Sequence, residues 1–115
     1  MIKKIGICIN QEIDNGVKYR DCVDFILASA NLFESNVFVF FLNDSALMLD
    51  QHDFGMHTKD YQKKLQMLEL FDTSLFVVDD VVFYNKNLKF ILPVEIVSKA
   101  KFNTFLKKCD LIFNF

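Results

Sequence analysis

The feature that most constrains this sequence is an uninterrupted apolar run at residues 37–42. A strand with apolar residues at successive positions has the same chemistry on both faces, so both faces must be covered. Helices supply that cover in α/β domains, where they pack on either side of a parallel sheet. The run is far shorter than the roughly 20 apolar residues that span a bilayer. It therefore predicts a strand inside a helix-covered sheet.

The rest of the chain alternates between strand-like and helix-like patterns. Short apolar runs predict further strands at residues 2–9, 74–78, 90–96 and 110–115. Apolar residues at spacings of three and four predict helices at residues 17–33, 59–70 and 98–108, and Ser45 and its neighbours can cap a short one at residues 46–49. Residues 50–58 are polar and are predicted to form a loop.

This alternation predicts the architecture. Each parallel return between strands needs a crossover, usually a helix, so alternating elements favour a parallel sheet between helices. Pro93 has no N–H to donate to a neighbouring strand, which predicts that the fourth strand lies at a sheet edge. No repeat or internal boundary is visible, so residues 1–115 are expected to form one domain.

Phenylalanine is unusually abundant, with 14 copies and no tryptophan in 115 residues. Each buried aromatic side chain removes about 150–250 Å² from water, and a domain of this size has limited interior for so many rings. Some phenylalanines should therefore lie at the surface, where a contiguous apolar patch usually marks a partner. The composition predicts obligate association with another protein.

Charge and cysteine content exclude several classes of protein. Lys and Arg total 13 against 15 Asp and Glu, a net charge of −2, and no basic cluster is longer than a pair. Direct nucleic-acid binding is therefore not expected. The three cysteines include no CxxC pair and do not form the framework of a small secreted domain. The first residues lack the apolar core of a signal peptide, so we expect a cytoplasmic protein without membrane contact.

The sequence offers few ligand sites. Its glycines, Gly6, Gly16 and Gly55, are too far apart for a phosphate-binding loop. His52 and His57 do not share a helical face as two metal ligands four residues apart would. With Asp53 they are expected to be solvated loop residues. We therefore expect no cofactor and no metal.

Two further groups of residues are candidates for chemistry. The acids Asp79 and Asp80 follow the predicted third strand, where open α/β sheets bind ligands, although acids at such junctions more often cap the next helix. Cys8 lies inside a predicted strand and Cys22 on the inner stripe of a helix. Cys109 follows the last helix, where the negative end of the helix dipole disfavours a thiolate. The sequence therefore indicates no convincing nucleophile.

Several segments together resemble a known family. They are residues 20–24 leading into 28–30, residues 37–41 closing on Asp44, residues 59–61, residues 68–72 and residues 110–115. In order and spacing these resemble the DsrE/DsrF-like sulfur-relay family, and within it the DsrF-like subunits. The likeness covers nearly the whole chain, with a shortened loop at residues 51–56.

The resemblance implies both a fold and a role. The fold is a three-layer α/β/α sandwich with a five-stranded parallel sheet in the order 4-3-2-1-5. The role is that of a subunit in a cytoplasmic heterohexamer with two related sister subunits, which passes persulfide sulfur toward 2-thiolation of the tRNA wobble uridine. The sulfur-carrying sister has a cysteine after its third strand, where this chain has Asp79. A carboxylate cannot hold sulfane sulfur, because persulfide exchange proceeds by thiolate attack.

The chain is therefore expected to be a non-catalytic subunit that acts through assembly. We expect its interface at Val81, Val82, Phe83 and Tyr84, because this segment follows the two acids and carries four large apolar or aromatic side chains in a row. The alternative is that two of them belong to the core and two are half-exposed, because a helical turn cannot bury all of its sides.

Two alternatives remain open at this point. One is a sulfur carrier that acts through a cysteine of its own. The other is a flavodoxin-like or receiver-like module that binds a small ligand in a crevice lined by Asp44, Asp79 and Asp80.

Overall fold

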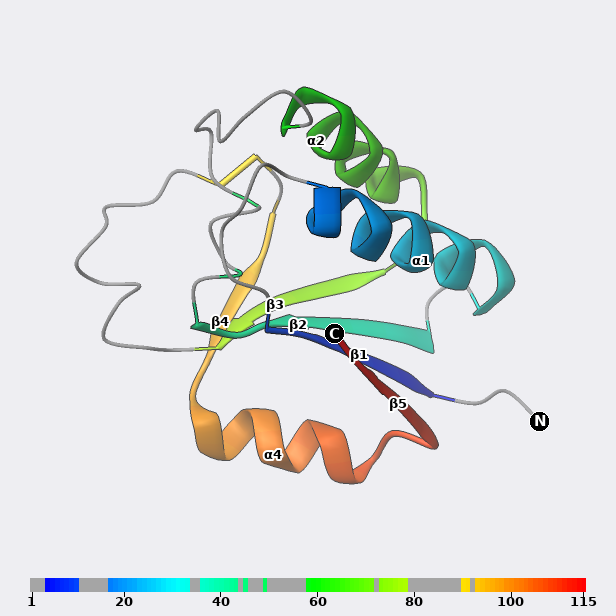
Figure 1. Ribbon diagram of the computed structural model, residues 1–115. Coiled ribbons are helices and arrows are strands. Elements are labelled where there is room, and N and C mark those ends of the chain that lie inside the picture. Colours follow the sequence, from blue (N-terminus) through cyan, green and yellow to red (C-terminus); the bar gives the residue numbers. More distant parts are fainter. Residues whose placement is uncertain are drawn as a thin grey trace.

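The computed structural model describes residues 4–10, 17–33, 36–43, 45, 49, 58–71, 73–78, 90, 91 and 93–115. In chain order they form β1 (Ile5–Ile9), α1 (Val17–Phe33), β2 (Val37–Phe41), α2 (Thr58–Gln66), the 3-10 helix η3 (Met67–Leu70), β3 (Ser74–Val78), β4 (Glu95–Val97), α4 (Lys99–Lys107) and β5 (Leu111–Asn114). Strands and helices alternate as the sequence predicts (Figure 1).

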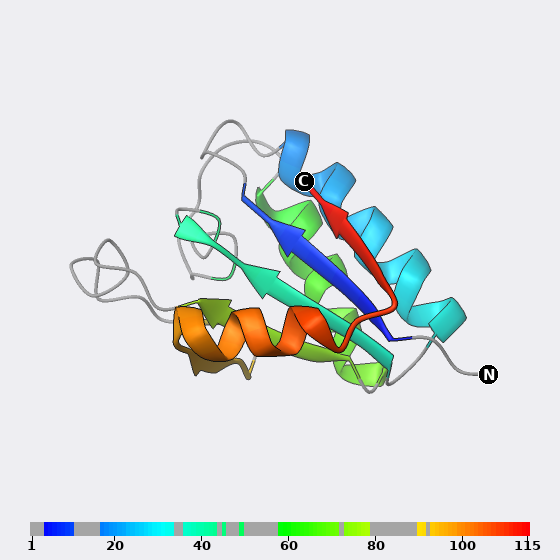
Figure 2. The same ribbon diagram turned by 90° about the horizontal axis from the view of Figure 1, so that it is seen from below.

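The strands form a single sheet in the order β4-β3-β2-β1-β5, and all neighbouring strands are parallel. Helices α1 and α2 cover one face of this sheet and α4 covers the other (Figure 1). The three-layer sandwich and the strand order expected from the family resemblance are both confirmed. β4 and β5 are the two edge strands, as Figure 2 shows from below.

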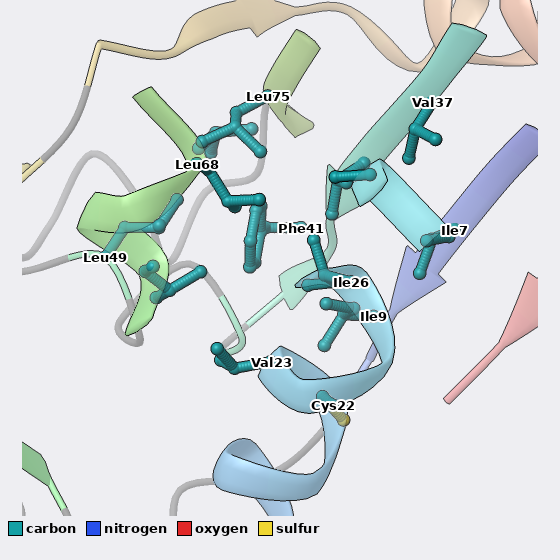
Figure 3. Packing of buried hydrophobic residues seen from close by; sticks show 14 of the residues in the cluster. Ile7, Ile9, Cys22, Val23, Ile26, Val37, Phe41, Leu49, Leu68 and Leu75 are labelled. Carbon is teal, nitrogen blue, oxygen red and sulfur yellow. The ribbon is translucent and has the colours of Figure 1, made fainter. Parts of the chain in front are cut away.

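Successive residues of the inner strands supply two separate cores, because side chains of a strand alternate between faces. Ile5, Ile7 and Ile9 of β1 join the larger core beneath α1 and α2, whereas Cys8 joins the core beneath α4. Figure 3 shows the larger core, in which side chains of α1 such as Val23 and Ile26 pack with those of the strands. Burial on both faces is the reason why these strands contain so few polar residues.

The core beneath α4 is built mainly from aromatic rings. Phe40 of β2 is fully buried there. Its ring stacks on that of Phe76 with centroids 5.1 Å apart and meets Phe102 of α4 edge-on at 5.0 Å. Phe105 of α4 lies 5.0 Å from Phe76, and Phe38 stacks at 6.4 Å from both of these rings. Offset and edge-on pairs of this kind are the favoured aromatic geometries.

The structure shows where most of the many phenylalanines lie. Most described phenylalanines are buried or half-buried, and they are divided between the core beneath α4 and the core beneath α1 and α2. Phe113 of β5 is exposed, in agreement with the expectation that some rings lie at the surface.

The predicted helix ends are partly confirmed. The Ser98 hydroxyl accepts a hydrogen bond from the Lys101 backbone N–H at 3.1 Å and caps α4, as expected. The helix predicted at residues 59–70 is α-helical only to Gln66 and then tightens into η3, a common form for a last turn. No helix in the described part of the chain has the length and apolar character needed to cross a membrane.

The fourth strand differs most from its prediction. β4 covers only Glu95–Val97, so Pro93 precedes the strand instead of lying within it. Before the strand, the backbone N–H of Ile91 donates a hydrogen bond to the carbonyl of Leu49 at 2.7 Å. β4 nevertheless lies at the sheet edge, as predicted. Residues 46–48 and 50–57, assigned to a short helix and a loop, lie outside the described residues.

Candidate functional site at the strand ends and thiols

A small polar cluster joins the carboxyl ends of β1 and β2, the place where open α/β sheets usually bind ligands. The Asn43 amide nitrogen donates to the Asn10 side-chain oxygen at 2.8 Å. The Ser45 hydroxyl lies 2.6 Å from the carbonyl oxygens of Ile9 and Leu42, and with its single proton it donates to one of them at a time. These groups satisfy one another and hold the two strand ends together.

Asn43 turns the chain at this point. Its φ of 53° lies in the left-handed region, which asparagine tolerates better than most residues with a Cβ. Sequence reasoning assigned residues 43–45 to a helix cap and missed the contact of Ser45 with the end of β1. That contact joins residues 36 positions apart, so no local sequence pattern predicts it.

Most of the side chains singled out in the sequence fall outside the described residues. This holds for Asp44, His52, Asp53, His57, Asp79, Asp80 and the expected interface residues Val81, Val82, Phe83 and Tyr84. The structure does fix the end of β3 at Val78, so Asp79 is the first residue after the strand. Among the described residues, no three His, Cys, Asp or Glu side chains come together as metal ligands.

Cys8 is buried in the core beneath α4, as its position in a strand predicted. Burial raises the pKa of its thiol from 9.0 to about 11, and the nearby Cys109 adds to the effect. At neutral pH the group therefore remains a thiol. It behaves as a small apolar side chain and not as a nucleophile.

Cys109 is the most accessible of the three thiols and follows the end of α4. Its Sγ donates to the Phe105 carbonyl at 3.4 Å. Partial burial raises the pKa of this thiol, Lys4 acts in the opposite direction, and Asp110 raises it further. Partial burial and the neighbouring acid thus disfavour a thiolate at Cys109.

Cys22 lies in the larger core on the inner side of α1, where almost none of its surface is exposed. None of the three cysteines forms a disulfide. The structure describes all three thiols of the chain. None of them is an accessible thiol with a lowered pKa. This arrangement suits packing better than sulfur transfer, which needs an accessible thiolate.

Gly6 makes room for Cys109 on the α4 face of β1. A Cβ at this position would lie 3.0 Å from the Cys109 Sγ and 3.7 Å from Cγ1 of Ile112. We expect Gly6→Val to lower the free energy of unfolding by about 1–3 kcal/mol through overpacking. Chemical denaturation measures this loss. Removal of the sulfur by Cys109→Ala should recover part of it, whereas an equal cost in both backgrounds would contradict the contact.

No protein-family model matches the chain. The chain is 27% identical over 119 residues to a protein named TusC homolog from Aliivibrio fischeri, and the match covers 99% of this chain and 100% of that protein. Its fold is similar to that of the crystal structure of the ychN protein from E. coli, with a TM-score of 0.76, 18% identity and coverage of 98% and 99% of the two chains. Sequence likeness from end to end and the shared sandwich fold agree with the resemblance seen in the sequence, and the chain is similar to a TusC homolog over its whole length.

Proposed function

We propose that this chain is a non-catalytic subunit of a cytoplasmic sulfur-relay complex. It assembles with two related sister subunits, TusB-like and TusD-like, into a heterohexamer that passes persulfide sulfur for 2-thiolation of the tRNA wobble uridine. The observation that carries the proposal is the likeness to a TusC homolog along the whole chain. The chain's own part in the relay is structural.

The environments of the cysteines support a structural role. A relay thiol must attack a sulfur atom as the thiolate, receive the sulfane sulfur and release it to the next carrier. Cys8 and Cys22 are buried, and the pKa values of Cys8 and Cys109 are raised. Each of these properties slows the first step.

The residue that follows β3 supports the same view. The family resemblance implies that the sulfur-carrying sister has a cysteine there, at the carboxyl edge of the sheet. In this chain β3 ends at Val78 and the next residue is Asp79. A carboxylate offers no sulfur nucleophile, so the relay step falls to a sister subunit.

For the interface with the sisters we propose Val81, Val82, Phe83 and Tyr84, directly after the two acids. These apolar side chains come one after another beyond the carboxyl end of β3. A surface of this composition is typical of the centre of a permanent interface, which is depleted in charge and rich in aromatic residues.

Co-expression of the tagged chain with its two sister subunits tests the assembly. We expect all three to co-purify in a fixed stoichiometry. Phe83→Asp should release the sisters and leave the melting temperature of the isolated chain within a few degrees, because it places a charge in an interface and not in the core. The matched control is Met67→Asp, which charges an exposed apolar residue of η3 and should leave the complex intact.

A second measurement tests the absence of relay chemistry. The purified chain is incubated with a persulfide donor, and mass spectrometry follows each cysteine. We expect no cysteine to gain a sulfur atom at the rate shown by the TusD-like sister. Rapid persulfide formation on Cys109, the most accessible thiol, would show instead that the chain carries sulfur itself. A monomer that ignores both sisters would contradict the assembly.

A further inference from the structure

The strand β5 is an exposed edge with an unusual composition. Its apolar residues Leu111, Ile112 and Phe113 are 42%, 43% and 38% exposed, and no described strand pairs with its outer side. Because adjacent residues of a strand point to opposite faces, this exposure affects both faces of the sheet. Half of the large apolar residues found exposed in the described chain belong to this one strand.

The hydrogen-bond register shows which backbone groups of β5 remain available. The N–H of Leu111 donates to Lys4 and that of Phe115 donates to Cys8, so these residues direct their polar groups toward β1. In a parallel ladder such residues alternate with residues that point the other way. The N–H and C=O groups of Ile112 and Asn114 therefore face outward, away from β1.

The two sheet edges differ in their protection against pairing. β4 carries Glu95, which forms an ion pair with Lys101 at 3.3 Å, and it follows Pro93. Charged residues and proline are the usual devices that keep an edge from pairing with another chain. Residues 111–115 contain neither a charge nor a proline. The unprotected edge is also the more apolar one.

Aromatic packing prepares the α1 face of this edge. Phe25 of α1 lies 5.0 Å from Phe113 and 5.0 Å from Phe115, so the three rings form one cluster beside the strand. α1 itself packs over β1 and β2. Helix α1 therefore does not cover the outer side of β5 on this face of the sheet.

We propose that β5 is a pairing edge that binds β5 of a second copy of this chain in antiparallel orientation, centred on Phe113. In this register Ile112 of one copy faces Asn114 of the other, and each pair exchanges both backbone hydrogen bonds. The two Phe113 residues then oppose each other as the non-hydrogen-bonded pair, with Cα atoms about 4.5 Å apart. The two sheets join into one continuous sheet.

A second copy fits this edge for reasons of symmetry and charge. The outward groups of Ile112 and Asn114 are self-complementary about a two-fold axis through the Phe113 pair, which is the requirement of an isologous interface. The side chains of residues 111–115 carry no charge, so no like-charged side chains oppose each other within the paired segment. Each Phe113 ring stays in contact with Phe25 of its own chain. The two Phe113 rings also form a cross-strand aromatic pair, a kind of pair that stabilises antiparallel strands.

The size of the contact limits its strength. One short strand buries well below the roughly 800 Å² per partner of a standard interface. We therefore expect a dissociation constant between about 1 µM and 1 mM. Sedimentation equilibrium of the full chain without other proteins, over about the same concentration range, should show the mass rise from 13.5 kDa toward twice that value. A mass of one chain at every concentration overturns the proposal.

Proline substitution tests the edge without harm to the internal ladder. Ile112→Pro removes an N–H that faces outward, so no bond to β1 is lost, and association should weaken at least about tenfold. Ile112→Val keeps the N–H and should remain within about twofold of the original affinity. If Ile112→Pro does not fold, Asn114→Pro serves the same purpose. A folded proline variant that still dimerises at the original affinity overturns the proposal.

Cross-linking tests the register. In a Cys109→Ser background, Phe113→Cys places two thiols on the symmetry axis at a Cα separation that a disulfide accepts. Oxidised glutathione, which takes up the two electrons, should link the copies covalently. Asn114→Cys is the matched control, because its copies lie beyond the roughly 7 Å limit and should not link. Linkage of the control alone overturns the register. The sister subunits are absent from these experiments, so their outcome is separate from that of the proposed function.

Discussion

Replacement of Phe40 by alanine should lower the free energy of unfolding by about 3–5 kcal/mol. Phe40 is fully buried, and its ring contacts Phe76 from the neighbouring strand and Phe102 from α4. The substitution removes a large side chain from the place where sheet and helix meet, and the rigid rings around it cannot collapse into the space. Denaturation by urea or guanidinium, followed by circular dichroism, measures the loss.

Two control variants define this result. Leu32→Ala removes an apolar side chain that is 74% exposed and should cost no more than about 0.5 kcal/mol. Phe40→Leu keeps an apolar side chain at the same site and should fall between the two. If Phe40→Ala proved as mild as Leu32→Ala, the aromatic cluster would not be the second core of the protein.

An increase in pH from about 9 to about 11 should reduce the contribution of Cys8 to stability by about 2 kcal/mol. The folded state raises the pKa of this thiol from 9.0 to about 11, chiefly through burial. Between these values the unfolded chain has released the proton while the folded chain still holds it. Stability that is present in full below pH 9 is therefore lost as pH rises through the folded pKa.

Comparison with Cys8→Ala isolates the effect of the Cys8 thiol from that of every other group in the protein. The free energy of unfolding of both proteins is measured over about 2 pH units on either side of pH 9. As pH rises, the free energy of unfolding of the original protein should fall relative to that of the alanine variant. Parallel curves would show that the Cys8 thiol ionises as easily in the folded protein as in the unfolded chain.

The two predictions bear on the same part of the molecule. Cys8 and Phe40 belong to the core beneath α4, so the thiol is part of the packing that holds this helix on the sheet. Burial keeps the Cys8 thiol protonated and leaves little of its surface exposed to a sulfur donor. This environment is one of the observations behind our proposal that a sister subunit performs the relay step.

Much of the fold followed from local patterns in the sequence. The run at residues 37–42 gave β2, the helical stripe beginning at residue 17 gave α1, and Ser98 marked the start of α4. Each of these signals depends on residues within a few positions of one another, which is why a single sequence suffices. The sheet order 4-3-2-1-5 came from the family resemblance, since no local pattern specifies which strands become neighbours.

Contacts between distant residues were not available from the sequence. The space that Gly6 leaves for Cys109 and the bond from Ser45 to Ile9 join parts of the chain that only the folded sheet brings together. The start of β4 after Pro93 also depends on its pairing with β3. Each is a product of the register between strands, which is set by the whole sheet.

The clearest contrast lies between β2 and β5. Both sequences are short, mainly apolar runs, and this pattern predicted that each forms a strand. β2 lies between β1 and β3 and is almost wholly buried, whereas β5 pairs on one side only and is exposed along its length. The amino-acid sequence thus determined which segments are strands. Tertiary structure alone decided which strand is covered, because burial depends on the number of neighbours that the sheet order provides.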